Sequence, residues 1–223
     1  MTQRMTRTAR LVLTGAALTV LAISPSAWGS LMTYNGVALS QTVQTHAPGK
    51  LADGLTTYAG QELITFENVN YKAYCVDLNQ YAATAQATAV PLNLTSFNNQ
   101  WQLAYLFDTY AAGVTTDLQA AALGTAIWEV LTEPNGGAFD VTDTYSQFWI
   151  TGNNSVAAAA NALLASLPAN YTPTVWPVVL QSATAQDFII PEPATLALLG
   201  VGGLVLLRSR RRCEARTPIR EGG

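Results

Sequence analysis

The central part of this sequence is poor in the side chains on which most enzymes depend. The 223-residue chain contains one histidine, His46, and two cysteines, Cys75 and Cys213. So few of these residues leave little material for a metal cage of His and Cys ligands, or for catalysis by a histidine base. The composition therefore disfavours most enzyme classes, and we expect neither a metal site nor a cofactor.

Positive charge is also scarce between the two ends of the chain. The whole sequence has 11 Lys and Arg against 14 Asp and Glu, a formal net charge of −3, but residues 30–190 contain only Lys50 and Lys72 beside 11 acidic residues. This segment therefore has a formal charge of −9, and it would repel a phosphate backbone. We expect no nucleic-acid partner. Its 161 residues suffice for one domain with its own core.

The N-terminus has the layout of a secretory signal peptide. Three arginines lie in the first ten residues, and an apolar run, Leu11–Ile23, follows. Ala27 and Gly29 are small residues at positions −3 and −1 of a cut before Ser30. The apolar run is also short for a membrane span, which needs about 20 residues. The sequence therefore predicts a cleaved signal peptide over residues 1–29.

The C-terminus combines a proline-rich stretch, a short apolar run and an arginine cluster. As a helix of about 14–17 residues, the apolar run would rise about 21–25 Å, against a hydrocarbon core of about 30 Å. Such a helix inserts if the bilayer thins and the arginines snorkel. The arginines then stay in the cytoplasm, and the main domain faces outward. The elements are Pro191-Glu192-Pro193, Leu196–Leu207, and Arg208, Arg210, Arg211 and Arg212.

This order of elements over residues 191–212 resembles the PEP-CTERM sorting signal. The resemblance implies recognition by an exosortase, a membrane transpeptidase-like enzyme of Gram-negative bacteria that make extracellular polysaccharide. The enzyme is expected to act near the Pro-Glu-Pro, where two prolines keep the chain extended and suppress helix. The implied partners are the exosortase, the secretion machinery and the inner membrane. The protein is then anchored there before processing and later lies at the cell surface or outside, and residues 213–223 form a cytoplasmic tail.

Residues 30–190 are expected to begin and end with strands. Alternating patterns and turn residues predict strands at 31–43, 57–66 and 71–78, with a tight connection at 67–70. Pro91 restricts any strand at 88–94 to a sheet edge, and residues 80–87 are expected to be a loop or a short helix. Closing strands are predicted at 174–181 and 187–190.

Three helices are expected between these strands. The first covers about 99–111, and the second begins at a capping box formed by Thr116 and Gln119 and runs to about Glu133. A third helix, ended by Pro168, is expected to be capped by Ser155. The sequence thus predicts an α+β fold, a β-sandwich or small β-barrel with an inserted helical layer.

Two segments of this domain together match the motif of a chemically reactive domain. The segment Tyr74-Cys75-Val76-Asp77-Leu78, followed about 50 residues later by Ala126-Ile127-Trp128, resembles the Cys–Gln thioester domain of bacterial surface adhesins. In that family a strand Cys and a helix Gln join with loss of ammonia to form an electrophile. The family's Gln lies four residues before the Trp, where this chain has Gly124. The resemblance therefore implies a degenerate thioester site at Cys75, Gly124 and Trp128.

Cys213 is expected on the cytoplasmic side and cannot pair with Cys75 before processing, so Cys75 is the only thiol of the exported domain. Two interpretations of Cys75 follow. It is a buried small hydrophobe on a core strand, or a reactive or intermolecular thiol. Gly124 costs about 1 kcal/mol against Ala in the middle of a helix. We expect close packing over the Cys75 strand to compensate for this cost.

Three further chemistries are conceivable for this domain. A cysteine hydrolase would need Cys75 with His46 as its base. Calcium would need Asp140 and Asp143, whose loop lacks EF-hand spacing. A paired-carboxylate glycosidase has many candidate acids, which are Asp77, Asp108, Asp117, Glu129, Glu133, Asp140 and Asp143, but any exported acidic domain supplies such a set.

The interpretation favoured is a non-enzymatic protein of the cell envelope or extracellular matrix. It would be an adhesin-like interaction module associated with extracellular polysaccharide. The abundant Asn, Gln, Thr and Tyr side chains suit hydrogen bonding to sugars and stacking on their rings. The alternative is a covalent thioester adhesin or a thiol enzyme that uses Cys75.

Overall fold

The structure is a computed structural model that describes residues 29–191. The predicted signal peptide, apart from its last residue, lies outside the described residues. So do residues 192–223, with most of the sorting signal, its apolar helix and the tail. Between residues 29 and 191 no helix combines the length and apolar character that crossing a bilayer requires.

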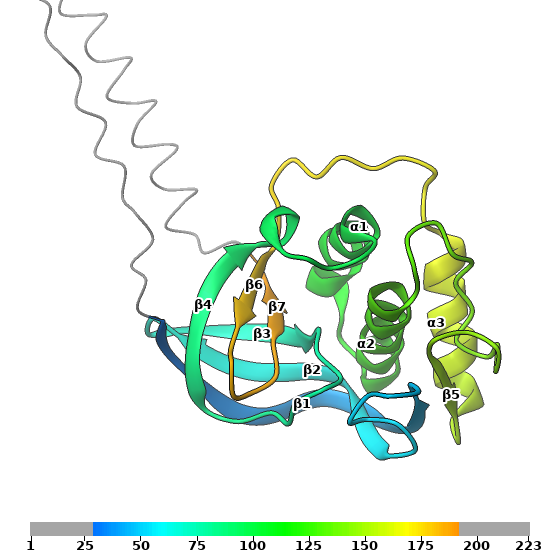
Figure 1. Cartoon of the computed structure of the whole chain (residues 1–223), viewed down its shortest axis with the longest axis horizontal. Helices are drawn as coiled ribbons and strands as arrows, with labels where there is room; N and C mark the ends of the chain where they lie inside the picture. Colours follow the sequence, from blue (N-terminus) through cyan, green and yellow to red (C-terminus); the bar gives the residue numbers. More distant parts are fainter. Residues whose placement is uncertain (1–28, 192–223) are drawn as a thin grey trace, which may run out of the picture.

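The described residues form a mixed α/β domain with a large antiparallel sheet and a few helices, as predicted (Figure 1). The strands are β1 (Ser30–His46), β2 (Thr56–Phe66), β3 (Val69–Cys75), β4 (Ala85–Pro91), β5 (Trp149–Thr151), β6 (Val178–Gln181) and β7 (Phe188–Ile190). The helices are α1 (Gln100–Tyr110), α2 (Asp117–Thr132) and α3 (Asn154–Ala165), with short 3-10 turns η1 (Leu92–Leu94) and η2 (Ala111–Gly113).

The sheet has the strand order β2-β3-β7-β6-β4-β1-β5. An additional pairing joins β2 to β1, so six strands form a closed ring and β5 extends it beyond β1. The last strand of the domain, β7, is one of the strands that form this ring, and it is hydrogen-bonded to β3 on one side and β6 on the other. Figure 1 shows the ring strands curving around one side of the domain, with the three helices and β5 gathered on the other.

Strand β4 lies between β6 and β1 in the strand order, but each of its residues pairs on one side only, so the stretch with Pro91 has the single neighbour predicted for it. Residues 85–87 pair with β1, and residues 88–91 pair with β6. Pro91 is the last residue of the strand, where its lack of an N–H disturbs the ladder least. The stretch expected to be a loop or a short helix therefore contributes its last three residues to the sheet.

The connection between β2 and β3 is a two-residue turn. Glu67 and Asn68 have φ angles of 50° and 64°, while Phe66 and Val69 pair on either side. Two successive positive φ angles match the right-handed twist of the flanking strands, which explains the tight hairpin. This turn lies inside the connection that the sequence predicted.

Helix α2 lies in the centre of the domain. Every residue from Ala120 to Val130 is buried, as expected for a helix that is covered on all sides. Its faces contact β1, β2 and β3 as well as α1 and α3. The predicted capping box is present: the Thr116 hydroxyl accepts from the Gln119 N–H, and the Gln119 side chain accepts from the Thr116 N–H.

The predicted cap of the third helix is wrong by two residues. The Asn153 side-chain oxygen accepts from the Val156 N–H at 3.2 Å, so Asn153 is the N-cap of α3. The Ser155 hydroxyl donates to the same Asn153 oxygen at 2.8 Å and acts as a support for the cap. Both residue types are good caps, so the sequence alone did not decide between them.

Candidate functional site

The two predicted thioester-like segments meet at the end of β3. The indole Nε1–H of Trp128, from α2, donates to the backbone carbonyl of Cys75 at 3.1 Å. The Cys75 thiol donates to the carbonyl oxygen of Asp77 at 3.0 Å. Cys75 is 4% exposed and Trp128 is 3% exposed, so this contact lies in the packed interior of the domain.

Burial controls the chemistry of the Cys75 thiol. Desolvation raises its pKa to about 12, and the negative charges of Asp77 and Glu62 contribute in the same direction. The thiolate is the nucleophilic form of cysteine, and it is almost absent at neutral pH when the pKa is this high. Of the two interpretations of Cys75, the structure supports the buried and protonated thiol.

Gly124 contacts β2 and not the Cys75 strand, which corrects the expected packing. A Cβ at Gly124 would lie 2.9 Å from the backbone nitrogen of Gly60. Gly60 itself has a φ of 155°, and a Cβ there would collide with the carbonyl oxygen of Leu39. The backbones of α2 and β2 therefore touch through two glycines. The position that carries glutamine in thioester domains has no room here for a side chain.

A partly buried pair of polar groups lies near Cys75. The Tyr34 hydroxyl donates to Glu62 Oε2 at 2.8 Å, and Glu62 is only 6% exposed. Desolvation raises the pKa of the Glu62 carboxyl to about 7, and burial raises the pKa of Tyr34 well above its usual range. The Tyr34 ring stacks on Phe188, the β7 residue that pairs with Cys75. Sequence reasoning missed this pair, and its only signal was an acid inside an apolar strand.

The structure does not bring His46 to Cys75. The His46 ring stacks on Trp149 with 5.0 Å between ring centroids, and its Nε2 lies 2.9 Å from the Thr151 hydroxyl. Both partners belong to β5, whereas the thiol of Cys75 bonds only to the backbone of Asp77. The nucleophile and base that a hydrolase would need are therefore held by different partners.

Four acids gather around the C-terminal end of α2 and the loop that follows it. Glu129 accepts from the Asp140 N–H at 2.8 Å, and Glu133 accepts from the Gln147 N–H at 2.6 Å. Burial raises the pKa of Glu129 to about 8, and the charges of Glu133, Asp140 and Asp143 add to this rise. These acids hold the loop in place. No group of three or more His, Cys, Asp or Glu within residues 29–191 is arranged to hold a metal ion.

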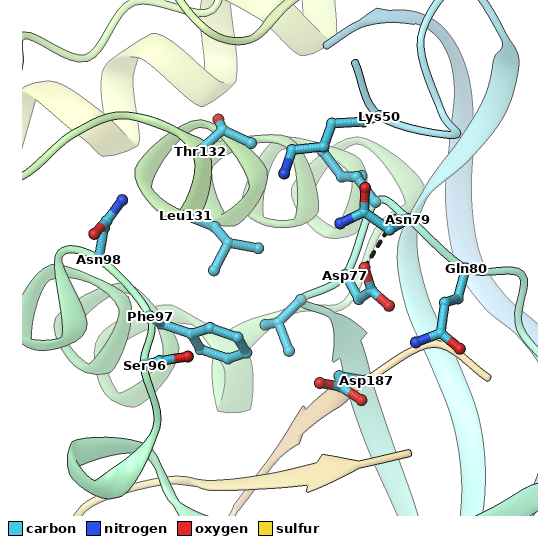
Figure 2. Close-up of a pocket in the computed structure, with 12 residues that line it drawn as sticks. Lys50, Asp77, Asn79, Gln80, Ser96, Phe97, Asn98, Leu131, Thr132 and Asp187 are labelled. Carbon is cyan, nitrogen blue, oxygen red and sulfur yellow. Dashed lines mark hydrogen bonds between the residues drawn. The ribbon is translucent and has the colours of Figure 1, made fainter. Parts of the chain in front are cut away.

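A pocket of about 380 Å³ opens where β3 ends, directly after Cys75 (Figure 2). Its wall comes from the loop after β3, the loop before α1, the end of α2, the β1–β2 loop and the residue before β7. It offers carboxylates, amides, hydroxyls, one lysine and one aromatic ring. The polar and aromatic lining residues are Lys50, Asp77, Asn79, Gln80, Ser96, Phe97, Asn98, Thr132 and Asp187.

The Phe97 ring lies across the pocket from several polar side chains. Figure 2 shows Phe97 and Leu131 on one side, together with Ser96, Asn98 and Thr132, and it shows Asp77, Asn79, Gln80 and Asp187 on the other. Burial raises the pKa of Asp187 to about 6, and the charge of Asp77 contributes to this rise. An aromatic surface opposite convergent hydrogen-bonding groups suits a ligand that carries hydroxyl groups on an apolar ring.

Sequence reasoning found only part of this pocket. Asp77 was singled out as a member of the Cys75 segment, but Lys50, Phe97, Asn98 and Asp187 were not. These residues come from segments that are far apart in the chain, and no spacing in the sequence connects them. The only signal was the position of Asp187, at the start of a predicted closing strand.

Comparison with known protein families matches residues 190–212 to the PEP-CTERM protein-sorting motif. This confirms the predicted sorting signal to within one residue at its start. The motif indicates an exported protein that transits a membrane and is processed by an exosortase. Neither the curated proteins nor the solved structures gave a match to this chain. The matched motif does not extend into the thioester-like segment, so that resemblance stays a prediction.

Proposed function

We propose that this exosortase-sorted protein is a non-catalytic, adhesin-like module that binds extracellular polysaccharide. The binding site is the pocket at the end of β3 (Figure 2). The observation that carries the proposal is the combination of the Phe97 ring with the facing amides and carboxylates. Sugars present two matching kinds of surface, an apolar ring face and a rim of hydroxyls.

The state of Cys75 supports a non-covalent role. Its thiol is protonated at neutral pH, donates to a backbone carbonyl and lies in the packed interior. Gly124 carries no acyl group and contacts backbone. The pocket beside this segment therefore acts through hydrogen bonds and stacking, and the covalent alternative gains no support from these contacts.

The negative charge of the domain limits which polysaccharides it can bind. Residues 30–190 have two lysines and 11 acids, so the domain has a strongly negative field. Two carboxylates in the pocket, Asp77 and Asp187, face a single cation, Lys50. A polymer rich in uronic acids or phosphate would be repelled, and a neutral or amino-sugar polymer would not. We expect the protein to be held in such a matrix after its tail is removed.

The test is binding of the purified domain to neutral polysaccharide, measured by calorimetry. Phe97→Ala should weaken binding at least about fivefold, because removal of a stacking aromatic in such sites costs more than about 1 kcal/mol. The matched control is Tyr145→Ala, which removes an aromatic ring that is 94% exposed and outside the pocket. Equal affinities for both variants would contradict the proposed site.

A second measurement tests the covalent alternative. The intact mass of the mature domain from its native host should account for the two terminal cuts with no further loss. A deficit of one ammonia, with Cys75 resistant to alkylation until methylamine is added, would establish a thioester instead. The same spectrum gives both termini of the mature protein and any attached glycan.

A further inference from the structure

The sorting motif begins inside the folded domain. All three residues of β7, Phe188–Ile190, are 0% exposed, and the strand is hydrogen-bonded to β3 and β6. The matched motif starts at residue 190, the last residue of this strand, and Pro191 follows directly. No spacer therefore separates the sheet from the segment that the sorting enzyme has to bind.

The stretch between β7 and the apolar run is short compared with the domain. Pro191–Thr195 contains five residues, which span about 17 Å even when fully extended. A compact domain of the described size has a radius of gyration of about 15 Å and is therefore about 40 Å across. An enzyme that holds these five residues in an extended conformation has to touch the surface of the domain around Pro191.

That surface has a definite composition. A pocket of about 500 Å³ is lined by Pro191 together with Tyr71, Lys72, Asp108, Val175 and Pro177, among others. We call these six residues the exit surface. In the antiparallel pairing of β3 with β7, Tyr74 lies opposite Ile189. If this register is continued by two residues, Lys72 lies opposite Pro191.

Charge makes Lys72 the distinctive residue of the exit surface. Residues 29–191 contain only two lysines and no arginine, and the other lysine, Lys50, lines the pocket of Figure 2. Lys72 is exposed, and 47% of Val175 is exposed beside it. The point where the chain leaves the domain therefore combines apolar surface with one cation, Lys72, and one carboxylate, Asp108.

We propose that the exit surface is a docking surface for the exosortase, which contacts the folded domain together with the Pro-Glu-Pro. The length of chain between β7 and the apolar run forces this contact, and Lys72 is the cation that the exit surface offers to the enzyme. In the processing step one peptide bond near the Pro-Glu-Pro breaks. Its acyl group passes to water or to an amine acceptor, and the leaving amine takes up the proton that the acceptor releases.

The experiment measures the rate of tail release from the full-length protein in membranes that contain the exosortase. Lys72→Glu should slow release about tenfold, because it replaces the only cation of the exit surface by a second carboxylate beside Asp108, in a contact that the short tether enforces. The control is Tyr145→Glu, which also adds a negative charge, at a residue that is 94% exposed and outside both pockets, and it should leave the rate unchanged. The melting temperatures of the two variants show whether each domain is folded.

A spacer variant separates enforced contact from recognition of the tail alone. Eight Gly and Ser residues inserted between Ile190 and Pro191 should restore the rate of Lys72→Glu to that of the wild-type chain. If Lys72→Glu is processed at the wild-type rate, or if the spacer gives no recovery, the proposal is wrong. Binding of the isolated domain to vesicles of anionic lipid, lost in Lys72→Glu, would assign the surface to the membrane and also overturn it.

Discussion

The segment Cys75–Asp77 has two very different surroundings. On its interior side it faces Trp128, the Tyr34–Glu62 pair and the ring of strands, all of them largely removed from solvent. On its outer side it borders the open pocket with Phe97 and Asp187. A thioester domain would place its chemistry on the interior side. Here that side is closed by packing, and the polar groups that a ligand could reach lie on the outer side.

This difference separates contacts that stabilise the domain from groups that a ligand can reach. The Trp128–Cys75 hydrogen bond joins helix to strand whatever the cysteine does chemically. The lack of a side chain at Gly124 allows the backbones of α2 and β2 to be in direct contact. The interior side therefore determines stability, and the outer side is where we place binding.

The largest expected effect tests whether the interior side has room for a side chain. Gly124→Gln would force a Cβ to 2.9 Å from the Gly60 nitrogen, so the helix or the strand has to shift. Overpacking of this kind costs about 3 kcal/mol, which lowers Tm by about 6–12 °C in a domain of this size. Thermal unfolding followed by circular dichroism measures it.

The control for this substitution is Gly113→Gln. No atom lies within 4 Å of a Cβ at Gly113, so its Tm should change little. If Gly124→Gln is as stable as this control and shows loss of ammonia, the interior side accommodates a glutamine, and the contrast between the two sides fails.

A second prediction concerns pH, because the interior side holds carboxyls without their charge. The ordinary pKa of Glu129 is 4.5, and in the folded protein burial raises it to about 8. Between these values the folded state keeps a proton that the unfolded state has released. Stability therefore falls as pH rises through this window, and Glu62 adds to the fall up to about pH 7.

The measurement is Tm at a series of pH values across that window. Glu129→Gln should flatten the dependence, since glutamine accepts the Asp140 N–H without a titrating group. Glu67→Gln, in the exposed β2–β3 turn, is the comparison variant and should keep the wild-type slope. A stability that rises with pH in the wild-type chain would contradict burial of these acids.

The smallest expected effect is on the thiol itself. Folded protein should resist iodoacetamide at about pH 8, because Cys75 is buried and its pKa is raised to about 12. Unfolding in denaturant should expose this thiol to stoichiometric alkylation. Cys75→Ala should cost only about 1 kcal/mol, a typical value for a single substitution. Rapid alkylation of the folded domain would place Cys75 on the outer side.

Local sequence signals predicted much of the fold. The capping box at Thr116 and Gln119 and the turn at Glu67-Asn68 each depend on residues that are neighbours in the chain, and each fixes its own element. The sorting signal was found for the same reason, since its three parts are contiguous. Features whose cause is local could therefore be predicted from the sequence.

Features that depend on distant pairing could not. Pro91 indicates a strand that is paired on one side, but the change of partner along β4 from β1 to β6 is decided by segments more than 50 residues away. Gly124 was expected over the Cys75 strand, yet it lies on Gly60 because helix α2 crosses β2. The pocket in Figure 2 was missed because its wall is assembled only when all these segments meet.

The position of β7 also sets the order in which the domain can fold. This strand is the last of the sheet in sequence but lies between β3 and β6. As the chain emerges from a translocation channel N-terminus first, β3 and β6 lack a shared neighbour until residue 190 has crossed. The ring therefore closes only when the Pro-Glu-Pro reaches the outer face of the membrane. Completion of the sheet and arrival of the processing segment thus occur at the same stage of export.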